Sequence, residues 1–254
     1  MEQAHRVLNS VGTTQIRRRS REVKSKIMFR SLASSSSGNL YVCDDGATKI
    51  MVECGLSYPK LAAALNHDVM GHAACLLSHE HADHAAAAQE LVKRGMDVWC
   101  HPATANALHI EDGAMVMLPG NTVRIGTFAV TAIETRHDVS SLGFLIYSRA
   151  TGEKLLFAID TCYLPNRFAG LTEIAVECNY SMEALMDDDV TPLSLKRRVM
   201  RTHMAVETFL GFCAANDLSR VRKIWMLHMS NDRGNAGLFA RMVREATGIP
   251  TEVC

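Results

Sequence analysis

Three imidazoles and the carboxylate of Asp83 lie close together in the stretch SHEHADH at residues 78–84. Imidazole nitrogens and carboxylate oxygens are the usual ligands of zinc and related divalent ions. An apolar segment typical of a strand precedes the stretch, and an alanine-rich segment typical of a helix follows it. At such a strand end we expect His79 and His81 to face one ion, while Asp83 and His84 face a second ion from the first helical turn. This context favours a metal site over a chance run of exposed histidines.

Other ligand-type residues stand where apolar, strand-like segments end, and these are His137, Asp160 and His228. An isolated histidine is more often a surface residue than a ligand, but the repeated position at strand ends favours ligation. We therefore predict two triads of metal ligands: His79, His81 and His137 for the first ion, and Asp83, His84 and His228 for the second. The carboxylate of Asp160 is predicted to touch both ions.

Such a ligand set predicts two divalent metal ions, zinc or manganese, with iron also compatible with imidazole and carboxylate ligands. Two ions about 3.5 to 4 Å apart ionise a water between them near neutral pH. They also neutralise the charge that grows on a substrate oxygen in the transition state, which suits phosphodiester hydrolysis well.

The composition is that of an ordinary globular protein. The chain has 254 residues, of which 48% are hydrophobic, and its 27 basic side chains equal its 27 acidic ones. No overall charge therefore draws the protein toward nucleic acid or an anionic membrane. No stretch approaches the ~18 apolar residues of a membrane span. The eight cysteines form no C-x-x-C pair, so we expect reduced cysteines and a cytoplasmic protein that does not bind a membrane.

Charge is concentrated at the N-terminus, where residues 1–26 carry seven basic and two acidic side chains. These residues show no apolar periodicity, so we expect a disordered basic extension before a domain at 27–254. The alternatives are an arm that touches phosphate backbones, or a chain that truly starts at Met28.

Strand-like and helical segments follow one another along the rest of the chain. Helices are predicted at 83–94, after the histidine stretch, and repeatedly within 181–217, where Leu185 and Leu193 are candidate buried residues. Two runs of strands, each followed by helices, predict an α/β protein with two sheets flanked by helices. We therefore predict a four-layer αβ/βα sandwich with its site along one edge.

A turn rich in small residues, 34–39, separates the first two predicted strands. It is either a simple loop or a nest of amides and hydroxyls that receives a phosphate. Ser36, Ser37 and Asn39 are accordingly candidate substrate-binding residues.

Together these residues resemble the metallo-β-lactamase superfamily, and closer features resemble its YycJ/WalJ-type branch. The closer features are the segments FRSLASSSSGNLYVC (29–43), VECGLS (52–57), FAIDTCYLP (157–165), VECNYSMEALM (176–186) and LHMSNDRGN (227–235). The resemblance covers the chain from about Met28 onward. It implies the αβ/βα sandwich, a dinuclear centre and hydrolase activity, with relatives that act as DNA exonucleases or as phosphodiesterases on cyclic phosphates and nucleotides.

Two departures from this family pattern concern the site. Glu53 stands where the family usually has an aspartate that supports the ligands from behind, so this longer carboxylate would have to fold back. The family's Gly-His-Leu-Ser-Asn segment is matched by residues 202–206, in which only His203 is kept. The resemblance implies that His203 holds the scissile phosphate or protonates the leaving oxygen, and we take Asp83 and His203 as the catalytic residues.

These observations predict a metal-dependent phosphodiesterase, and most directly a nuclease that resembles a DNA exonuclease. The alternative within this class is a hydrolase of small cyclic phosphates or cyclic nucleotides. A thioester or lactam hydrolase is a weaker prediction, and a metal-binding scaffold without catalysis is weaker again because all seven candidate ligands are present. The expected partner is a nucleic acid or a small phosphodiester, and the oligomeric state stays open, with a homodimer as one option.

Overall fold

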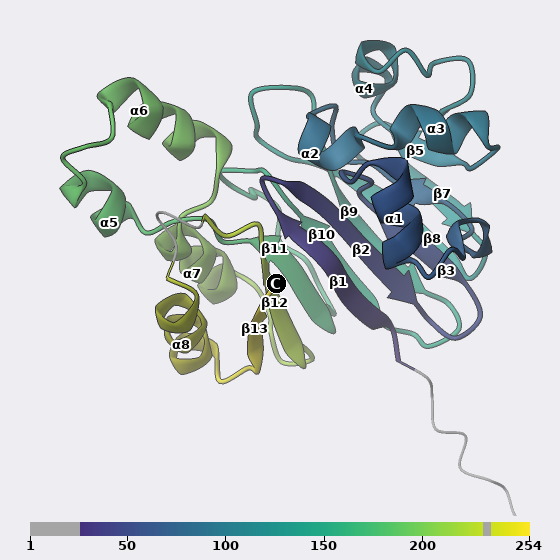
Figure 1. Cartoon of the computed structure of the whole chain (residues 1–254). Coiled ribbons are helices and arrows are strands. Elements are labelled where there is room, and N and C mark those ends of the chain that lie inside the picture. Colours follow the sequence, from purple (N-terminus) through teal and green to yellow (C-terminus); the bar gives the residue numbers. More distant parts are fainter. Residues whose placement is uncertain (1–25, 231–234) are drawn as a thin grey trace, which may run out of the picture.

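Two β-sheets form the centre of the molecule (Figure 1). The computed structural model describes residues 26–230 and 235–254. The predicted basic extension therefore lies, except for its last residue, outside the described residues. Among the described residues, no helix is long and apolar enough to cross a membrane.

The first sheet contains six strands in sequence order. They are β1 (Met28–Ser35), β2 (Gly38–Asp44), β3 (Lys49–Val52), β4 (Cys75–Leu76), β5 (Val98–Cys100) and β6 (Met115–Val116). Pairing is antiparallel from β1 to β3 and parallel from β3 to β6. Strands β2 and β3 thus form an antiparallel hairpin.

The second sheet contains seven strands, also in sequence order. They are β7 (Thr122–Ile125), β8 (Phe128–Glu134), β9 (Leu142–Ser148), β10 (Lys154–Ala158), β11 (Glu173–Glu177), β12 (Lys223–Leu227) and β13 (Thr251–Val253). Pairing is antiparallel from β7 to β10 and parallel from β10 to β13. The carboxyl ends of the parallel strands therefore meet at one edge, where ligand sites of such sheets are built.

Helices cover the outer face of each sheet (Figure 1). The helices of the described residues are α1 (Tyr58–Ala64), η1 (Val69–Gly71), α2 (Ala82–Ala85), α3 (Ala88–Lys93), α4 (Pro102–Ala107), α5 (Met182–Asp187), α6 (Leu193–Thr202), α7 (Val206–Ala215) and α8 (Ala236–Thr247). Helices α1, α3 and α4 pack on the first sheet, and α7 and α8 on the second. Figure 1 shows α5 and α6 extending away from the sheets.

The buried side chains divide into the layers of a sandwich. Along β2, Tyr41 and Cys43 join the core between the two sheets, whereas Leu40 and Val42 join the core under α1 and α3. Side chains alternate between the faces of a strand, and here both faces are covered, so β2 is an almost continuous buried run. The predicted four-layer α/β sandwich is confirmed.

Two local predictions were wrong. The segment 83–94 is not one helix, because the chain turns between α2 and α3, where the amide of Ala87 donates to the carbonyl of Cys54 at 3.0 Å. Leu185 is buried as predicted, but Leu193 is 58% exposed on α6. All eight cysteines are free thiols, as predicted.

Candidate metal centre

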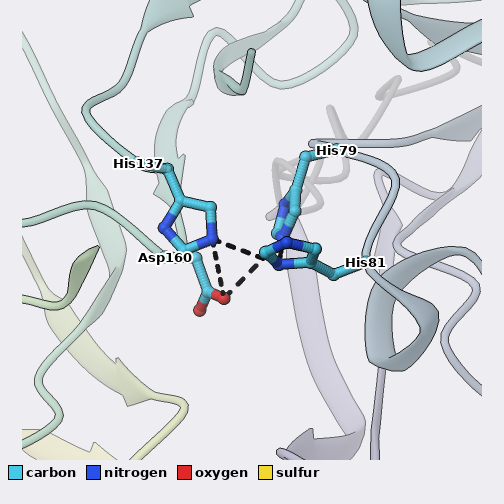
Figure 2. Close-up of side chains that lie close together, drawn as sticks. All are labelled: His79, His81, His137 and Asp160. Carbon is cyan, nitrogen blue, oxygen red and sulfur yellow. Dashed lines mark hydrogen bonds and ion pairs between the residues drawn. The ribbon is translucent and has the colours of Figure 1, made fainter. Parts of the chain in front are cut away.

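Four side chains converge at the edge between the two sheets (Figure 2). His79 and His81 come from the loop after β4, His137 follows β8, and Asp160 follows β10. The Nδ1 of His81 lies 3.1 Å from the Nε2 of His79 and 3.2 Å from the Nε2 of His137. The Oδ2 of Asp160 lies 3.7 Å from each of these two Nε2 atoms. Three ring nitrogens and a carboxylate oxygen aimed at one point are the donor set of a divalent ion.

A second group lies beside the first and shares a residue with it. The Oδ2 of Asp83 is 3.4 Å from the Nε2 of His84 and 3.5 Å from the Nε2 of His228. The Oδ2 of Asp160, which faces the first group, is also 3.4 Å from the Nε2 of His84. The structure thus brings together all seven residues that the sequence predicted as metal ligands.

The buried Nε2 of His228 gives a test of whether these residues suit a metal. Apart from its 3.5 Å contact with the Oδ2 of Asp83, it has no hydrogen-bond or ion-pair partner among the residues that the structure describes. A buried polar atom without such a bond is costly unless something else satisfies it. A divalent cation between His228, His84 and Asp83 would do so, and the imidazole and carboxylate donors are those that zinc and manganese accept. The fold and this cluster together indicate divalent metal binding.

Three residues at this edge have the left-handed backbone conformation that side chains other than glycine rarely adopt. The φ angles are 64° at Glu53, 46° at Asp160 and 50° at His228. Each residue stands just after a strand, β3, β10 or β12. Such strain is characteristic of functional sites, where the surrounding fold holds an unfavourable conformation.

Close backbone packing fixes the loop that carries Asp83 and His84. The amide of Cys54 donates to the carbonyl of His84 at 2.8 Å. A Cβ atom at Gly55 would lie 1.6 Å from the carbonyl oxygen of Asp83. Only glycine therefore allows the loop after β3 to approach the ligand loop this closely.

The ring nitrogens that face away from the centre have partners of their own. The Nδ1 of His79 lies 2.8 Å from the hydroxyl of Ser78, and the Nδ1 of His137 lies 3.1 Å from the carbonyl of Thr202. Such partners set the orientation of ligand imidazoles.

Glu53 supports the second group in the same way, despite being longer than the family's aspartate. Its Oε2 lies 3.2 Å from the Nδ1 of His84, and its Oε1 accepts from the amide of Ser78 at 3.3 Å.

The predicted substrate-binding residues lie in two different environments. Ser36 and Ser37 are exposed in the turn between β1 and β2. Asn39 is fully buried, and its amide nitrogen lies 3.1 Å from the carbonyl of Asp83 and 3.3 Å from the Nε2 of His84. Asn39 is therefore placed to hold the ligand loop rather than to meet a substrate.

The carboxylate of Glu177 also belongs to this site, although the sequence did not lead us to predict it. It ends β11, is fully buried, and its Oε1 lies 2.5 Å from the Nδ1 of His203 and 3.6 Å from the Nδ1 of His228. Its other oxygen accepts from the amide of Thr161 at 2.9 Å. The signal was present, because an acidic residue at the end of an apolar strand matches the position of His137 and Asp160.

The charges at this centre shift the pKa values of its groups. Burial lowers the pKa of His79, and the neighbouring His84 lowers it further. Burial also works against a charged His84, but the carboxylates of Asp160 and Asp83 outweigh it and raise the pKa well above its usual value. For His228, burial opposes the charge, and Asp160 and Asp83 still raise the pKa to about 10. Protons thus balance the carboxylates here, and cations that bind would displace them.

Comparisons with known proteins agree with this geometry. The chain is 26% identical over 222 residues to the exodeoxyribonuclease WalJ of Streptococcus pneumoniae, covering 80% of this chain and 82% of that protein. It is 27% identical over 233 residues to the exodeoxyribonuclease YycJ of Bacillus anthracis, covering 84% and 86%. The crystal structure of the metallo-beta-lactamase fold protein YhfI of Bacillus subtilis superposes with a TM-score of 0.68 at 15% identity, covering 89% and 95%.

A family model also matches the part of the chain that contains the site. The model of the beta-lactamase superfamily domain matches residues 48–229, which include all seven predicted ligands and more than half of the chain. The chain therefore belongs to the beta-lactamase superfamily.

Proposed function

We propose that the chain is a hydrolase that holds two divalent metal ions, zinc or manganese, and cleaves phosphodiester bonds as a nuclease acting on DNA. The observation that carries this proposal is the Oδ2 of Asp160. It borders both donor groups, at 3.7 Å from the Nε2 of His79 and 3.4 Å from the Nε2 of His84. A carboxylate that borders both donor groups can contact both ions of a two-metal centre. We place the ions in one domain, 27–254, that follows a basic extension.

Two ions bound at this centre would supply an ionised water near neutral pH and would offset the charge that grows on the phosphate oxygens. The residues of the chain position both reactants. Asp83, His84 and His228 would hold one ion, and His79, His81, His137 and Asp160 would hold the other.

His203 is suited to give a proton to the leaving oxygen. Its Nδ1 is 2.5 Å from Glu177, so its Nε2 is the nitrogen that can meet a substrate, and the side chain is 21% exposed. Burial disfavours its charged form, but the carboxylate of Glu177 outweighs burial and raises the pKa of His203. A charged imidazole is thereby kept near neutral pH, as a general acid requires.

The choice of DNA as substrate is supported by the relatives. WalJ and YycJ, both named exodeoxyribonucleases, align with four fifths or more of this chain. The family model, which matches residues 48–229, spans the predicted ligands and His203.

The test is to purify the protein, count its metal, and supply linear DNA, single-stranded RNA, cyclic nucleotides and bis-p-nitrophenyl phosphate in parallel. The proposal expects hydrolysis of the generic diester and shortening of linear DNA, both lost in His84→Ala. Preference for cyclic nucleotides over DNA in kcat/KM would contradict the nuclease assignment. Absence of hydrolysis of every diester by metal-loaded protein would contradict the phosphodiesterase itself.

A further inference from the structure

A basic pocket lies beside the metal centre, between α6 and the loop that follows β8. We call it the α6 pocket, and it is lined by His137, Asp138, Arg198, Arg201 and Thr202. Its volume is about 310 Å³, which is at the small end of the range for ligand sites. His137 is shared between the pocket and the candidate centre, so a molecule that enters the pocket lies next to the reacting groups.

The charge on α6 is of one sign. The helix, LSLKRRVMRT, contains four basic and no acidic residues. Lys196 is buried and donates to the carbonyl of Met186 at 3.2 Å, whereas Arg197, Arg198 and Arg201 are exposed. In a chain with no net charge, this is a local basic surface directly beside the centre.

Two guanidinium groups and one carboxylate line the pocket. An Nη of Arg198 is 3.5 Å from the Oδ2 of Asp138, and the Nε of Arg201 donates to the carbonyl of Arg197 at 3.2 Å. The side chain of Arg198 is 65% exposed, and an ion pair as exposed as this is worth little. An anion can therefore replace Asp138 on Arg198 at small cost, and the lining keeps one excess positive charge to attract it.

The end of α6 is fixed to the centre at two points. The carbonyl of Thr202, its last residue, lies 3.1 Å from the Nδ1 of His137, and the next residue, His203, is bound to Glu177. The positions of Arg198 and Arg201 relative to the reacting groups are thus set by the same contacts that orient a metal ligand and the proposed acid.

We propose that the α6 pocket binds a backbone phosphate of the nucleic-acid strand, one that neighbours the phosphate to be cleaved. Guanidinium groups bind phosphate oxygens through paired hydrogen bonds, which an ammonium group cannot do. A single-phosphate substrate fills the metal centre alone, whereas a strand extends from it into the pocket. This inference rests on the proposed function and names the residues that hold its polymeric substrate.

The test measures binding, so that it does not depend on turnover. The metal-loaded protein is titrated with a fluorescent single-stranded oligonucleotide whose phosphorothioate linkages resist cleavage, at several salt concentrations. The variants are Arg198→Ala, Arg201→Ala and Arg198→Lys. The matched control is Arg197→Ala, which removes the same charge from the same helix but lies outside the pocket lining. Arg124→Ala, on the exposed edge strand β7, is the distant control.

Arg198→Ala and Arg201→Ala should each weaken binding about fivefold or more, with Arg198→Lys in between. Each alanine variant should also lower the slope of log K against log salt by about 0.7, as loss of one phosphate contact on a single strand does. Both controls should bind within about twofold of the unchanged protein.

Equal losses of oligonucleotide affinity in Arg197→Ala and Arg198→Ala would contradict the proposal. They would show that binding depends on the overall charge of α6 and not on the pocket. Unchanged binding in both pocket variants, or no oligonucleotide binding by the unchanged protein, would also contradict the proposal. Failure of the proposed function is distinguishable, because it would appear as absent hydrolysis of bis-p-nitrophenyl phosphate, which these binding measurements do not involve.

Discussion

Buried polar side chains join the two sheets at both ends of the sandwich, and the two ends differ in how those side chains are satisfied. At the end away from the metal centre, Asp45 in the turn between β2 and β3 accepts four hydrogen bonds. The donors are the hydroxyls of Thr127 and Ser148, at 2.7 and 2.6 Å, and the amides of Ala47 and Thr48, at 3.0 and 2.9 Å. Each of these four contacts pairs a donor with an acceptor.

At the candidate centre, by contrast, ring nitrogens face other ring nitrogens as well as carboxylates. His79, His81 and His137 direct nitrogens at a single point, and the buried Nε2 of His228 has no hydrogen bond to a described residue. Buried polarity alone therefore does not identify a site. A completed network such as that of Asp45 stabilises the fold, whereas converging ligand atoms require something that is not part of the chain.

The largest effect is expected from removing a predicted metal ligand at the candidate centre. Asp83→Ala or His84→Ala should reduce hydrolysis of bis-p-nitrophenyl phosphate by at least about a thousandfold, because metal ions supply several kcal/mol of charge stabilisation. Circular dichroism should show the fold intact. Activity within about tenfold of the unchanged protein would contradict a two-metal mechanism.

A smaller effect is expected from the packing behind the centre. Gly55→Ala forces the carbonyl of Asp83 to move, because the new Cβ would lie 1.6 Å from it. A displacement of this size should lower kcat/KM by about a hundredfold. Gly211→Ala in α7 is the matched control, because a Cβ there meets no atom within 4 Å. Equal kcat/KM values in the two variants would show that the ligand loop is not held by this contact.

At the end away from the metal centre, substitution of Asp45 should lower stability and leave activity unchanged. Asp45→Ala removes the acceptor of the Ser148 hydroxyl and of two amides, and one of the two partners of the Thr127 hydroxyl. It should therefore lower the free energy of unfolding by about 2 kcal/mol. Denaturant titration measures this loss, while metal content and kcat stay unchanged. Asp44→Ala, which loses only one exposed bond to the amide of Gly46, is the control and should cost less than about 1 kcal/mol. Loss of metal from Asp45→Ala would contradict the claim that Asp45 acts on stability alone.

The smallest expected effect is the pH dependence of this end. Burial alone would raise the pKa of Asp45, but the hydrogen bonds from Ser148, Thr127, Thr48 and Ala47 outweigh it and lower the pKa. A lowered pKa stabilises the fold fully above the unfolded value of about 4 and loses this contribution as the pH falls through the folded value. The stability difference between the metal-free protein and metal-free Asp45→Asn should therefore be constant above about pH 5 and shrink below about pH 4. A difference that stays constant down to pH 3 would show that the Asp45 carboxylate is not held in its charged form.

Much of the fold was predictable because its signals are local. Strands covered on both faces are continuous apolar runs, and His137, Asp160 and His228 stand where such runs end. The ligand stretch 78–84 combines a strand, a turn and a helix start within a few residues. These features depend on neighbouring residues, so the sequence alone predicts them.

The remaining features depend on contacts between distant segments. The split of the predicted helix 83–94 follows from a bond between Ala87 and Cys54. Asn39 looks like a loop residue suited to a substrate, but the turn of β1 into β2 places it against the loop of Asp83. Glu177 is a different case. It ends an apolar strand, as the segment before His137 does, so the sequence alone was sufficient to identify it.

Metal content measures the central claim most directly. The purified chain, saturated with zinc or manganese and then dialysed, should contain two ions per molecule by mass spectrometry. Asp45→Ala should also contain two, and a variant with both Asp83→Ala and His84→Ala should contain one. One ion or none in the unchanged chain, or two ions in the double variant, would contradict a centre built from two donor groups that share Asp160.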